Sequence, residues 1–370
     1  MKDKKPTVLV GMSGGVDSSV SAALLVEQGF SVVGGFIKNW SDSKDVWSGE
    51  CQWKGERRDA IRVAAALNIP LLTFDFEEEY RRRVVDELFR GYEAGETPNP
   101  DVLCNQSIKF GLFLEEAKKL GIQYVATGHY ARIERDSDGA ARLLRGVDTD
   151  KDQSYFLYRV PQEALRMSLF PIGHLKKSEV REEARRLGLP VAEKPDSQGI
   201  CFIGKLDMQD FLRTRIPSTP GEITDADGTG IGSHEGLDGF TIGQRAGIRV
   251  SRGALPWYVA EKDLKQNRLI VVQGEDHPML YRSETDARDL HWTGRSAPSF
   301  PLDCEVQVRY RQDPVRCVIP VQTGIHLRVD FKTPVKAVTA GQSAVFYQGE
   351  ECLGGGIMLH SGHVAAQPAI

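Results

Sequence analysis

One stretch decides the fold of the first half of the chain: Val8-Leu9-Val10-Gly11-Met12-Ser13-Gly14-Gly15-Val16-Asp17-Ser18-Ser19. An apolar, strand-like run enters a glycine-rich turn, and a helix-like run leaves it. A strand that passes into a helix in this way brings several backbone N–H groups and a helix N-terminus to one point, which is an arrangement that binds phosphate. The two glycines let phosphate oxygens approach the backbone, and the serines add hydroxyl donors. The alternative is a turn whose glycines serve only its shape.

The loop lacks the Gly-Lys-Ser/Thr ending of a Walker A sequence. Its core, Ser13-Gly14-Gly15-Val16-Asp17-Ser18, instead resembles the PP-loop of the ATP pyrophosphatases. Enzymes of that group hold the β- and γ-phosphates of ATP and cleave between the α- and β-phosphates. The resemblance implies that a substrate is adenylated and that pyrophosphate is released.

Strand-like and helix-like runs alternate up to about residue 135. The strand-like runs are 7–12, 31–37, 71–76 and 123–127, and the helix-like runs are 18–28, 56–67, 77–92 and 108–120. This order predicts an α/β fold with a doubly wound parallel sheet that binds ligands at the carboxyl ends of its strands. With the PP-loop, it indicates an adenine nucleotide α-hydrolase-like domain over 1–210. Further helices are expected at 161–168 and 176–187, after a hairpin that turns at 136–139 and returns at 142–144.

The pattern changes after about residue 210. A Gly/Asp-rich tract, 225–232, precedes short strands, so a small and mostly β central domain is expected over 211–280. From residue 303, apolar and polar residues alternate, with turn signals about every ten residues, which is typical of a small barrel or sandwich. We predict a C-terminal β-barrel over 281–362 and a loose tail over 363–370. Arg309 and Arg311 should share one strand face, suited to a phosphate track or simply solvated.

Composition sets broader limits. The 370 residues suffice for two or three domains, and 41% apolar with 26% charged residues is ordinary for a soluble protein. No apolar run reaches the roughly 20 residues of a membrane span. The start passes directly into a strand without a signal-peptide pattern. Six thinly spread cysteines favour the cytoplasm, and a net charge of −4 neither indicates nor excludes nucleic-acid binding. We expect a monomer with no membrane contact.

Two cysteines are candidates for chemistry. Cys104 follows two prolines, which predict an extended loop ahead of the 108–120 helix, and a nearby helix N-terminus favours the reactive thiolate. Asp101 lies close enough in sequence to move a proton. A buried structural cysteine is the alternative, and the polar setting argues against it. Cys201 has apolar neighbours, so a small core residue is the default. The cysteine and histidine spacing predicts no metal site.

One helix carries a basic stripe. Lys177, Arg181 and Arg185 recur every four residues, so they share one face of the helix expected at 176–187. We interpret the stripe as a solvated face, with contact to an RNA backbone as the alternative.

Several long segments, in this order and spacing, give the chain a specific resemblance. They are GMSGGVDSSVSA, TPNPDVLCN, ATGHYARI, KDQSYFLY, DSQGICFIG, YRQ and TAGQSAVFY. Over residues 5–358, the chain resembles the tRNA-specific 2-thiouridylases, which place sulfur on C2 of the wobble uridine. The resemblance implies ATP and Mg²⁺ as cofactors, the anticodon stem-loop of tRNA as partner, and an upstream persulfide donor, either a sulfur-relay protein or a cysteine desulfurase.

The resemblance also implies roles for individual residues. Cys201 would carry the persulfide, Cys104 would be the second thiol that resolves or releases the sulfur, with a disulfide as product, and Asp101 would transfer the proton. Residues implied to bind ATP are Gly11, Met12, Ser13, Gly14, Gly15, Val16, Asp17, Ser18, Ile37 (usually methionine in the family) and Gly128. Residues implied to meet tRNA are Asn99, Pro100 and Asp101 at the target base, with His129, Lys151, Asp152, Gln153, Arg309, Tyr310 and Gln342.

Three alternatives stay open. Another PP-loop enzyme would adenylate its substrate without needing two cysteines. A non-catalytic RNA-binding or redox-sensing protein would bind tRNA without releasing pyrophosphate. An iron–sulfur cluster held by Asp101, Cys104 and Cys201 would replace the persulfide pair, because three ligands with one open iron position are chemically reasonable.

Overall fold

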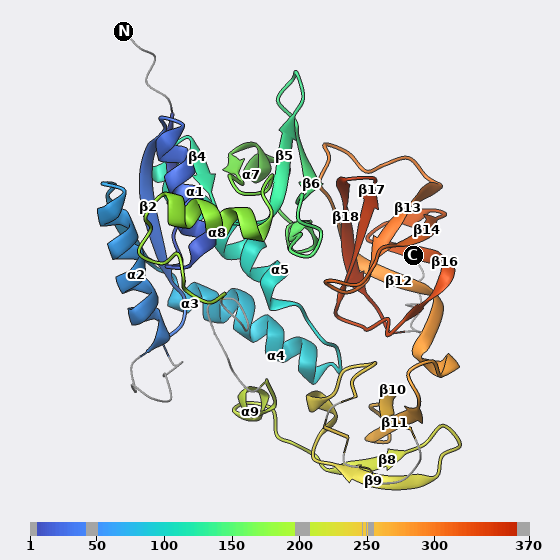
Figure 1. Cartoon of the computed structure of the whole chain (residues 1–370). Helices are drawn as coiled ribbons and strands as arrows, with labels where there is room; N and C mark the ends of the chain where they lie inside the picture. The colour runs from blue at the N-terminus through green and yellow to red at the C-terminus, as the bar shows by residue number, and fades with distance from the viewer. Residues whose placement is uncertain are drawn as a thin grey trace.

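The computed structural model describes residues 6–41, 51–196, 208–245, 247–248, 250 and 255–360. Figure 1 shows an α/β unit at the N-terminal end, a β-barrel beside it, and a small central sheet below both. Among the described residues, no helix is long and apolar enough to cross a membrane.

The N-terminal unit is built on a parallel five-stranded sheet. In spatial order its strands are β3 (Leu71–Asp75), β2 (Ser31–Lys38), β1 (Thr7–Gly11), β4 (Tyr124–Ala126) and β7 (Ser168–Leu169). Neighbouring side chains of β1 point to opposite faces, so Val8 joins one core cluster and Leu9 joins another. The predicted doubly wound parallel sheet is confirmed.

Helices cover both faces of this sheet. The face of Val8 packs against α1 (Val16–Glu27), α2 (Gln52–Ala66) and α8 (Lys177–Arg186). The face of Leu9 packs against two longer helical stretches. The first comprises α3 (Glu77–Tyr80), a π-helical turn (Arg81–Val85) and α4 (Asp86–Glu93), and the second comprises α5 (Pro100–Cys104), a π-helical stretch (Asn105–Leu112) and α6 (Phe113–Lys119).

The second of these stretches corrects the predicted extended loop before residue 108. The helix already begins at Pro100, because the Asn99 side chain accepts hydrogen bonds from the N–H groups of Asp101 (3.1 Å) and Val102 (3.4 Å). Proline suits the first helical position, where no intrahelical N–H is needed. Asn99 and Pro100 therefore start the helix. A smaller correction concerns the helix expected at 161–168: α7 spans Gln162–Arg166 and Ser168 begins β7.

The C-terminal barrel is antiparallel and closed. Its strands follow one another as β12 (Tyr281–Trp292), β16 (His326–Lys336), β14 (Val315–Ile319), β13 (Leu302–Gln307), β17 (Ser343–Gln348) and β18 (Glu351–Met358), and pairing of β18 with β12 closes it. The short β15 (Gln322–Thr323) pairs with β16. Apolar side chains from all six strands fill the interior, Cys304 and Cys317 among them. The predicted barrel is confirmed.

A hairpin ties the barrel to the N-terminal unit. β5 (Ala131–Arg135) pairs with β6 (Ala141–Arg145), and β6 continues the barrel sheet through Leu144 opposite Glu351. Side chains from β17 and β18, such as Tyr347 and Cys352, belong to the same core cluster as Leu9. The two units therefore share one hydrophobic core.

The central sheet is small. Its order is β10 (Trp257–Asp263), β11 (Arg268–Gln273), β8 (Gly221–Thr224) and β9 (Gly230–His234). Short helical pieces flank it: α9 (Met208–Arg213) and 3₁₀ turns at Leu237–Gly239 and Pro278–Leu280, with a further 3₁₀ turn at Ser154–Phe156 in the N-terminal unit.

The strand predicted to carry Arg309 and Arg311 ends earlier than expected. β13 stops at Gln307, and a turn follows in which Gln312 N–H donates to the Arg309 carbonyl (3.1 Å) and Arg311 has φ of +65°. The two arginines therefore do not share a strand face, and the expected phosphate track along it is wrong.

Candidate active site

A cavity of about 900 Å³ opens where β1, β2 and β4 end. Its walls include the glycine loop, the segment after β4, the start of α8 and the α5 region. Tyr310 and Arg311 from the barrel turn complete it. The site therefore lies between the N-terminal unit and the barrel, at the edge where doubly wound sheets bind ligands.

The glycine loop has a fixed shape. Gly14 has φ of +73°, and a Cβ there would lie 2.2 Å from the Glu56 carbonyl oxygen. The Ser18 hydroxyl lies 3.2 Å from the Ser13 N–H, which donates to it, and the Ser19 hydroxyl donates to the Gly15 carbonyl (2.7 Å). Gly128 lies directly against the loop, because a Cβ there would be 2.7 Å from the Ser18 nitrogen. The loop and the N-terminus of α1 therefore form one rigid corner.

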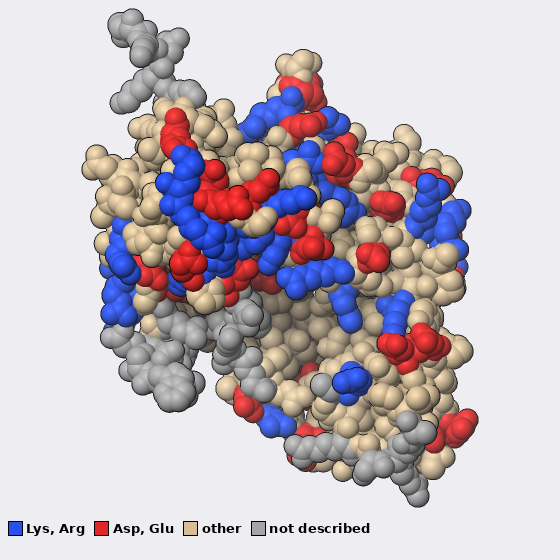
Figure 2. Space-filling model, viewed as in Figure 1, with Lys and Arg blue, Asp and Glu red and all other residues tan. Residues whose placement is uncertain are grey.

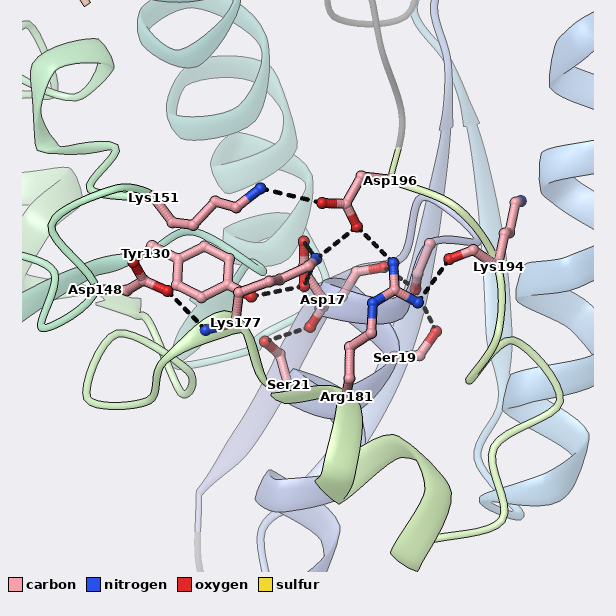
Figure 3. A network of polar contacts seen from close by, with 12 residues as sticks. Asp17, Ser19, Ser21, Tyr130, Asp148, Lys151, Lys177, Arg181, Lys194 and Asp196 are labelled. Atoms are coloured by element: carbon pink, nitrogen blue, oxygen red, sulfur yellow. Dashed lines mark hydrogen bonds and ion pairs between the residues drawn. The ribbon is translucent and has the colours of Figure 1, made fainter. Parts of the chain in front are cut away.

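A network of charges surrounds Asp17 (Figure 3). The Tyr130 hydroxyl (2.9 Å) and the Lys177 ammonium (2.7 Å) both donate to its carboxylate. Burial, reinforced by Asp17, raises the pKa of Tyr130, so this phenol remains a donor. Lys177 also pairs with Asp196 (2.9 Å), so one ammonium joins the glycine loop to residue 196.

Asp196 collects two further cations. Lys151 lies 3.2 Å and Arg181 2.8 Å from its carboxylate. Partial burial acts to raise the pKa of Asp196, but the hydrogen bonds and charges of Lys177 and Lys151 outweigh it and lower the pKa to about 2. The aspartate is therefore an anion that three cations hold at the wall of the cavity.

The basic stripe on α8 is thus not the solvated face that we expected. The side chains of Lys177 and Arg181 are 15% and 23% exposed, and both turn toward Asp196. Arg185 remains on the surface with Glu193. Figure 2 shows Lys and Arg interspersed with Asp and Glu on this face, without a uniform positive field. Lys177, Tyr130 and Asp196 are site residues that we did not predict, although two of them lie in the motifs quoted above.

Lys194 supports the loop from the other side. Its ammonium donates to the Gly14 carbonyl (3.0 Å) and to the Asp59 carboxylate (2.7 Å). This lysine was also missed, because 180 positions separate it from the carbonyl that it contacts.

His129 is held as a neutral ring. It is buried at the cavity wall, and its Nδ1 lies 2.7 Å from the Thr127 hydroxyl. Burial, followed by the charge of Lys109, keeps the pKa of His129 well below its usual range. The ring is therefore suited to hydrogen bonding as a neutral group.

The two cysteine candidates differ in what the structure describes. Cys104 is completely buried in the core cluster of the N-terminal unit, so the expectation that its polar setting argues against burial is wrong. One turn earlier, Asp101 lines the cavity. Cys201 lies outside the described residues, and Asp196, five positions before it, lines the cavity.

The structure gathers most of the other predicted residues at this cavity. Those on its walls are Gly11, Met12, Ser13, Gly15, Val16, Asp17, Ser18, Ile37, Asp101, Gly128, His129, Lys151, Gln153 and Tyr310. Predicted residues that do not line it, besides Cys104, are Asn99, Pro100, Gly14, Asp152, Arg309 and Gln342.

The side chains of three of these residues form hydrogen bonds with backbone groups. Asp152 accepts from the N–H groups of Gly146 (2.9 Å) and Ser154 (3.1 Å). Arg309 donates to the Ile242 carbonyl (3.1 Å) in the central domain, and burial lowers its pKa. Gln342 donates to a carbonyl of the N-terminal unit.

The site residues fit ATP and Mg²⁺. The cavity lies within the roughly 300–1,000 Å³ of ligand pockets, and its glycine loop presents backbone N–H groups and a helix N-terminus to phosphate. Within the described ranges, no group of three or more His, Cys, Asp or Glu side chains could hold a metal. Magnesium needs no such group, because it usually takes one or two carboxylates together with substrate phosphates, and Asp17 faces the cavity.

Comparison with known families covers nearly the whole chain. Residues 6–205 match the family described as the tRNA methyl transferase HUP domain, 209–273 its PRC-barrel domain, and 282–358 the aminomethyltransferase beta-barrel domain. A "tRNA-specific 2-thiouridylase MnmA" of Lactococcus lactis subsp. cremoris is 47% identical over 366 residues, which are 97% of this chain and 96% of the relative. One of Streptococcus thermophilus is 47% identical over 360 residues, 96% of each.

A solved 4-thiouridine synthetase–RNA complex with bound ATP is also similar. It is 15% identical, with a TM-score of 0.35 over 57% of this chain and 50% of that chain. This overlap is too low to support an argument about the site. The descriptions of the family models refer to methyl transfer, whereas the names of the full-length relatives refer to thiolation. Because these relatives are 47% identical over nearly the entire chain, their name carries more weight.

Proposed function

Because the chain belongs to the family of tRNA-specific 2-thiouridylases, we propose that it is a sulfurtransferase that replaces the C2 oxygen of wobble uridine, U34, with sulfur. The observation that carries the proposal is the single cavity that joins the glycine loop, Asp101 and the barrel turn. A loop for ATP and a carboxylate close to a thiol are both needed for this chemistry. We expect the anticodon stem-loop as substrate, and a monomer acting in the cytoplasm.

The first step activates the base. The C2 oxygen attacks the α-phosphorus of ATP, pyrophosphate leaves, and AMP becomes bonded to that oxygen as a leaving group. The residues implied to hold ATP supply backbone N–H groups for the departing pyrophosphate, and Lys177 lies at the same wall. When bound, Mg²⁺ supplies charge neutralisation on the phosphates.

The second step transfers sulfur. The terminal sulfur of a persulfide on Cys201 attacks C2, the bond to AMP breaks, and the base is joined to Cys201 through a disulfide. The Cys104 thiolate then attacks the Cys201 sulfur, which releases the thiolated base and leaves a Cys104–Cys201 disulfide. In the alternative order, Cys104 releases hydrosulfide first. Asp101, at the cavity wall, is the group that transfers the proton.

Chain geometry allows Cys201 to take part. Five residues span at most about 17 Å, and Asp196, at the cavity wall, lies five positions before Cys201. The buried Cys104 sulfur, in contrast, must become accessible before it can react. We infer that tRNA, ATP or the persulfide donor opens a path to it.

We propose tRNA contacts at three places: the start of α5 (Asn99, Pro100 and Asp101), the N-terminal unit (His129, Lys151, Asp152 and Gln153) and the barrel (Arg309, Tyr310 and Gln342). We propose that Tyr310 stacks on an RNA base, which is supported by its packing against Phe156 (4.4 Å between ring centroids) at the cavity wall. Base stacking on an aromatic ring needs no sequence-specific hydrogen bond. The wobble base is already partly exposed in an anticodon loop, so little unstacking is required.

Two variants separate the two steps. We expect Asp17→Ala to abolish pyrophosphate release, and Cys201→Ser to stop 2-thiouridine formation while pyrophosphate release persists. Purified protein with tRNA, ATP and a persulfide donor is assayed for pyrophosphate, and tRNA nucleosides are analysed by mass spectrometry. Thiolation retained in Cys201→Ser would refute the persulfide role. Turnover that survives serine at both Cys104 and Cys201 would favour another PP-loop reaction.

Two other outcomes identify the remaining alternatives. Iron and sulfide that remain bound in stoichiometric amounts after anaerobic purification would indicate an iron–sulfur cluster at Asp101, Cys104 and Cys201 instead of a persulfide pair. Binding of tRNA without any pyrophosphate release would make the chain a non-catalytic RNA-binding protein.

A further inference from the structure

The segment that leads into α5 is held by the C-terminal barrel. Thr97 is nearly buried, its N–H donates to the Ala340 carbonyl (2.8 Å), and its own carbonyl accepts from the Gln342 side chain (2.7 Å). One barrel loop, 339–342, thus binds both the N–H and the carbonyl of Thr97, although Thr97 lies 245 positions before Gln342 in the chain. Two residues further on, Asn99 caps the helix that carries Asp101 and Cys104.

The contact is also tight. Gly341, between the two hydrogen-bonding residues, has φ of +88°, and a Cβ there would lie 2.6 Å from the Thr97 nitrogen and 2.8 Å from the Glu96 Cβ. Glu96 is itself nearly buried and pairs with Arg288 of β12 (2.9 Å). Backbone of the barrel therefore lies directly against backbone of the 96–97 segment, a fit that needs glycine.

The central domain braces the same barrel loop. Arg309 spans from the Ile242 carbonyl (3.1 Å) to the Thr339 hydroxyl (3.3 Å), and that hydroxyl donates to the Ala337 carbonyl (2.8 Å). The Arg309 side chain is half-buried, and one of its guanidinium nitrogens is engaged by these two acceptors. The loop that holds Thr97 is thus fixed from behind by a second domain.

We propose that the barrel loop 339–342 positions segment 97–104, which carries the proposed base contacts at 99–101, with Gln342 and Gly341 as positioning residues for sulfur transfer. The loop acts through Thr97 on the cap at Asn99, and so on the placement of Asp101 and Cys104. This rests on the proposed function for the role of 97–104, whereas the contact itself does not depend on it. A role of Gln342 solely as an RNA contact is the competing outcome.

Hydrogen–deuterium exchange on the full-length protein without tRNA tests the proposal first. We expect Gln342→Ala and Gly341→Ala to speed exchange of the 97–104 amides by roughly 2- to 10-fold. The first variant removes a hydrogen bond to Thr97, and the second adds a Cβ that forces the barrel loop away from the Thr97 nitrogen. Gln322→Ala is the matched control: its amide also donates to a carbonyl within the barrel (2.8 Å, Gly324), and it should leave 97–104 unchanged. Unchanged exchange in both loop variants would overturn the proposal.

Kinetics give the second readout. Single-turnover assays of Gln342→Ala should show slower 2-thiouridine formation with ATP affinity unchanged, because the glycine loop belongs to a different element. If Gln342 acts only as an RNA contact, its alanine variant should raise the KM for tRNA and leave both the single-turnover rate at saturating tRNA and the exchange unchanged. That result would overturn the proposal. If the wild-type protein makes no 2-thiouridine, the proposed function fails, whereas the exchange experiment still decides whether the loop restrains 97–104.

Discussion

At the residue scale, the site is organised by carboxylates that one lysine joins. Lys177 contacts both Asp17 of the glycine loop and Asp196 at the cavity wall. The sequence motifs indicated Asp17, but no local pattern indicated its partner, because 160 positions separate the two. Cys104 shows the same limit from the other side: its polar neighbours in sequence suggested exposure, and tertiary packing buried it completely.

Asp196 gives a pH prediction. Its pKa is lowered to about 2 by its cations, so the folded state favours the charged form. A lowered carboxyl pKa contributes stability above the unfolded value near 4, and this contribution disappears as pH falls from about 4 to about 2. The unfolding free energies of wild type and Asp196→Asn should therefore differ at pH 6 and converge toward pH 2. Urea titrations across this range measure both, and a difference that stays constant would contradict the pairing.

At the element scale, the helix that starts at Pro100 differs most from its predicted structure. Alternation of apolar runs sufficed to predict the parallel sheet and most of its helices, because hydrophobic periodicity reports element type directly. The start of α5 differs from the prediction, because prolines can form either a loop or the start of a helix. Here Asn99 is the N-terminal cap and Pro100 is the first helical residue. The strand predicted through Arg309 and Arg311 is also wrong, because Arg311 adopts a positive φ in a turn although the apolar and polar residues around it alternate.

The cap can be tested by substitution. Asn99→Ala should lower the unfolding free energy by about 1 kcal/mol, because two N–H groups at the start of α5 lose their acceptor. Asn99→Asp, which retains an oxygen acceptor, is the matched control and should lose little. Urea unfolding monitored by circular dichroism measures both. Equal stability of the alanine variant and wild type would show that the cap does not hold the helix.

At the scale of the whole molecule, the barrel and the N-terminal unit form one structural unit. The composition change near residue 210 and the strand alternation after 303 were enough to expect separate β parts. The sequence could not show that hairpin β5–β6 joins the barrel sheet, or that Tyr347 enters the N-terminal core. Contacts between distant segments leave no periodic signature, so only the folded chain reveals them. Figure 1 shows α4 running from the N-terminal sheet toward the other two parts.

Tyr347 tests this shared core. Its ring is buried beneath the Arg145 guanidinium (3.5 Å to the centroid), and its hydroxyl lies 3.2 Å from the Ser154 hydroxyl. Tyr347→Ala should cost about 3–5 kcal/mol of stability, as other aromatic truncations in cores do. Tyr347→Phe removes only the hydrogen bond and should cost about 1 kcal/mol. Because the core is shared, we expect both variants to unfold in one transition by fluorescence and circular dichroism. A separate early transition of the barrel would contradict a common core.

The proposed function requires that the C2 oxygen of the target uridine is adenylated and then displaced by sulfur. The most direct measurement uses tRNA that carries ¹⁸O at C2 of U34, incubated with the protein, ATP and a persulfide donor. Mass spectrometry of the nucleotide products should find the ¹⁸O in AMP, in an amount equal to the 2-thiouridine formed. Label recovered in inorganic phosphate or water, with unlabelled AMP, would contradict the account.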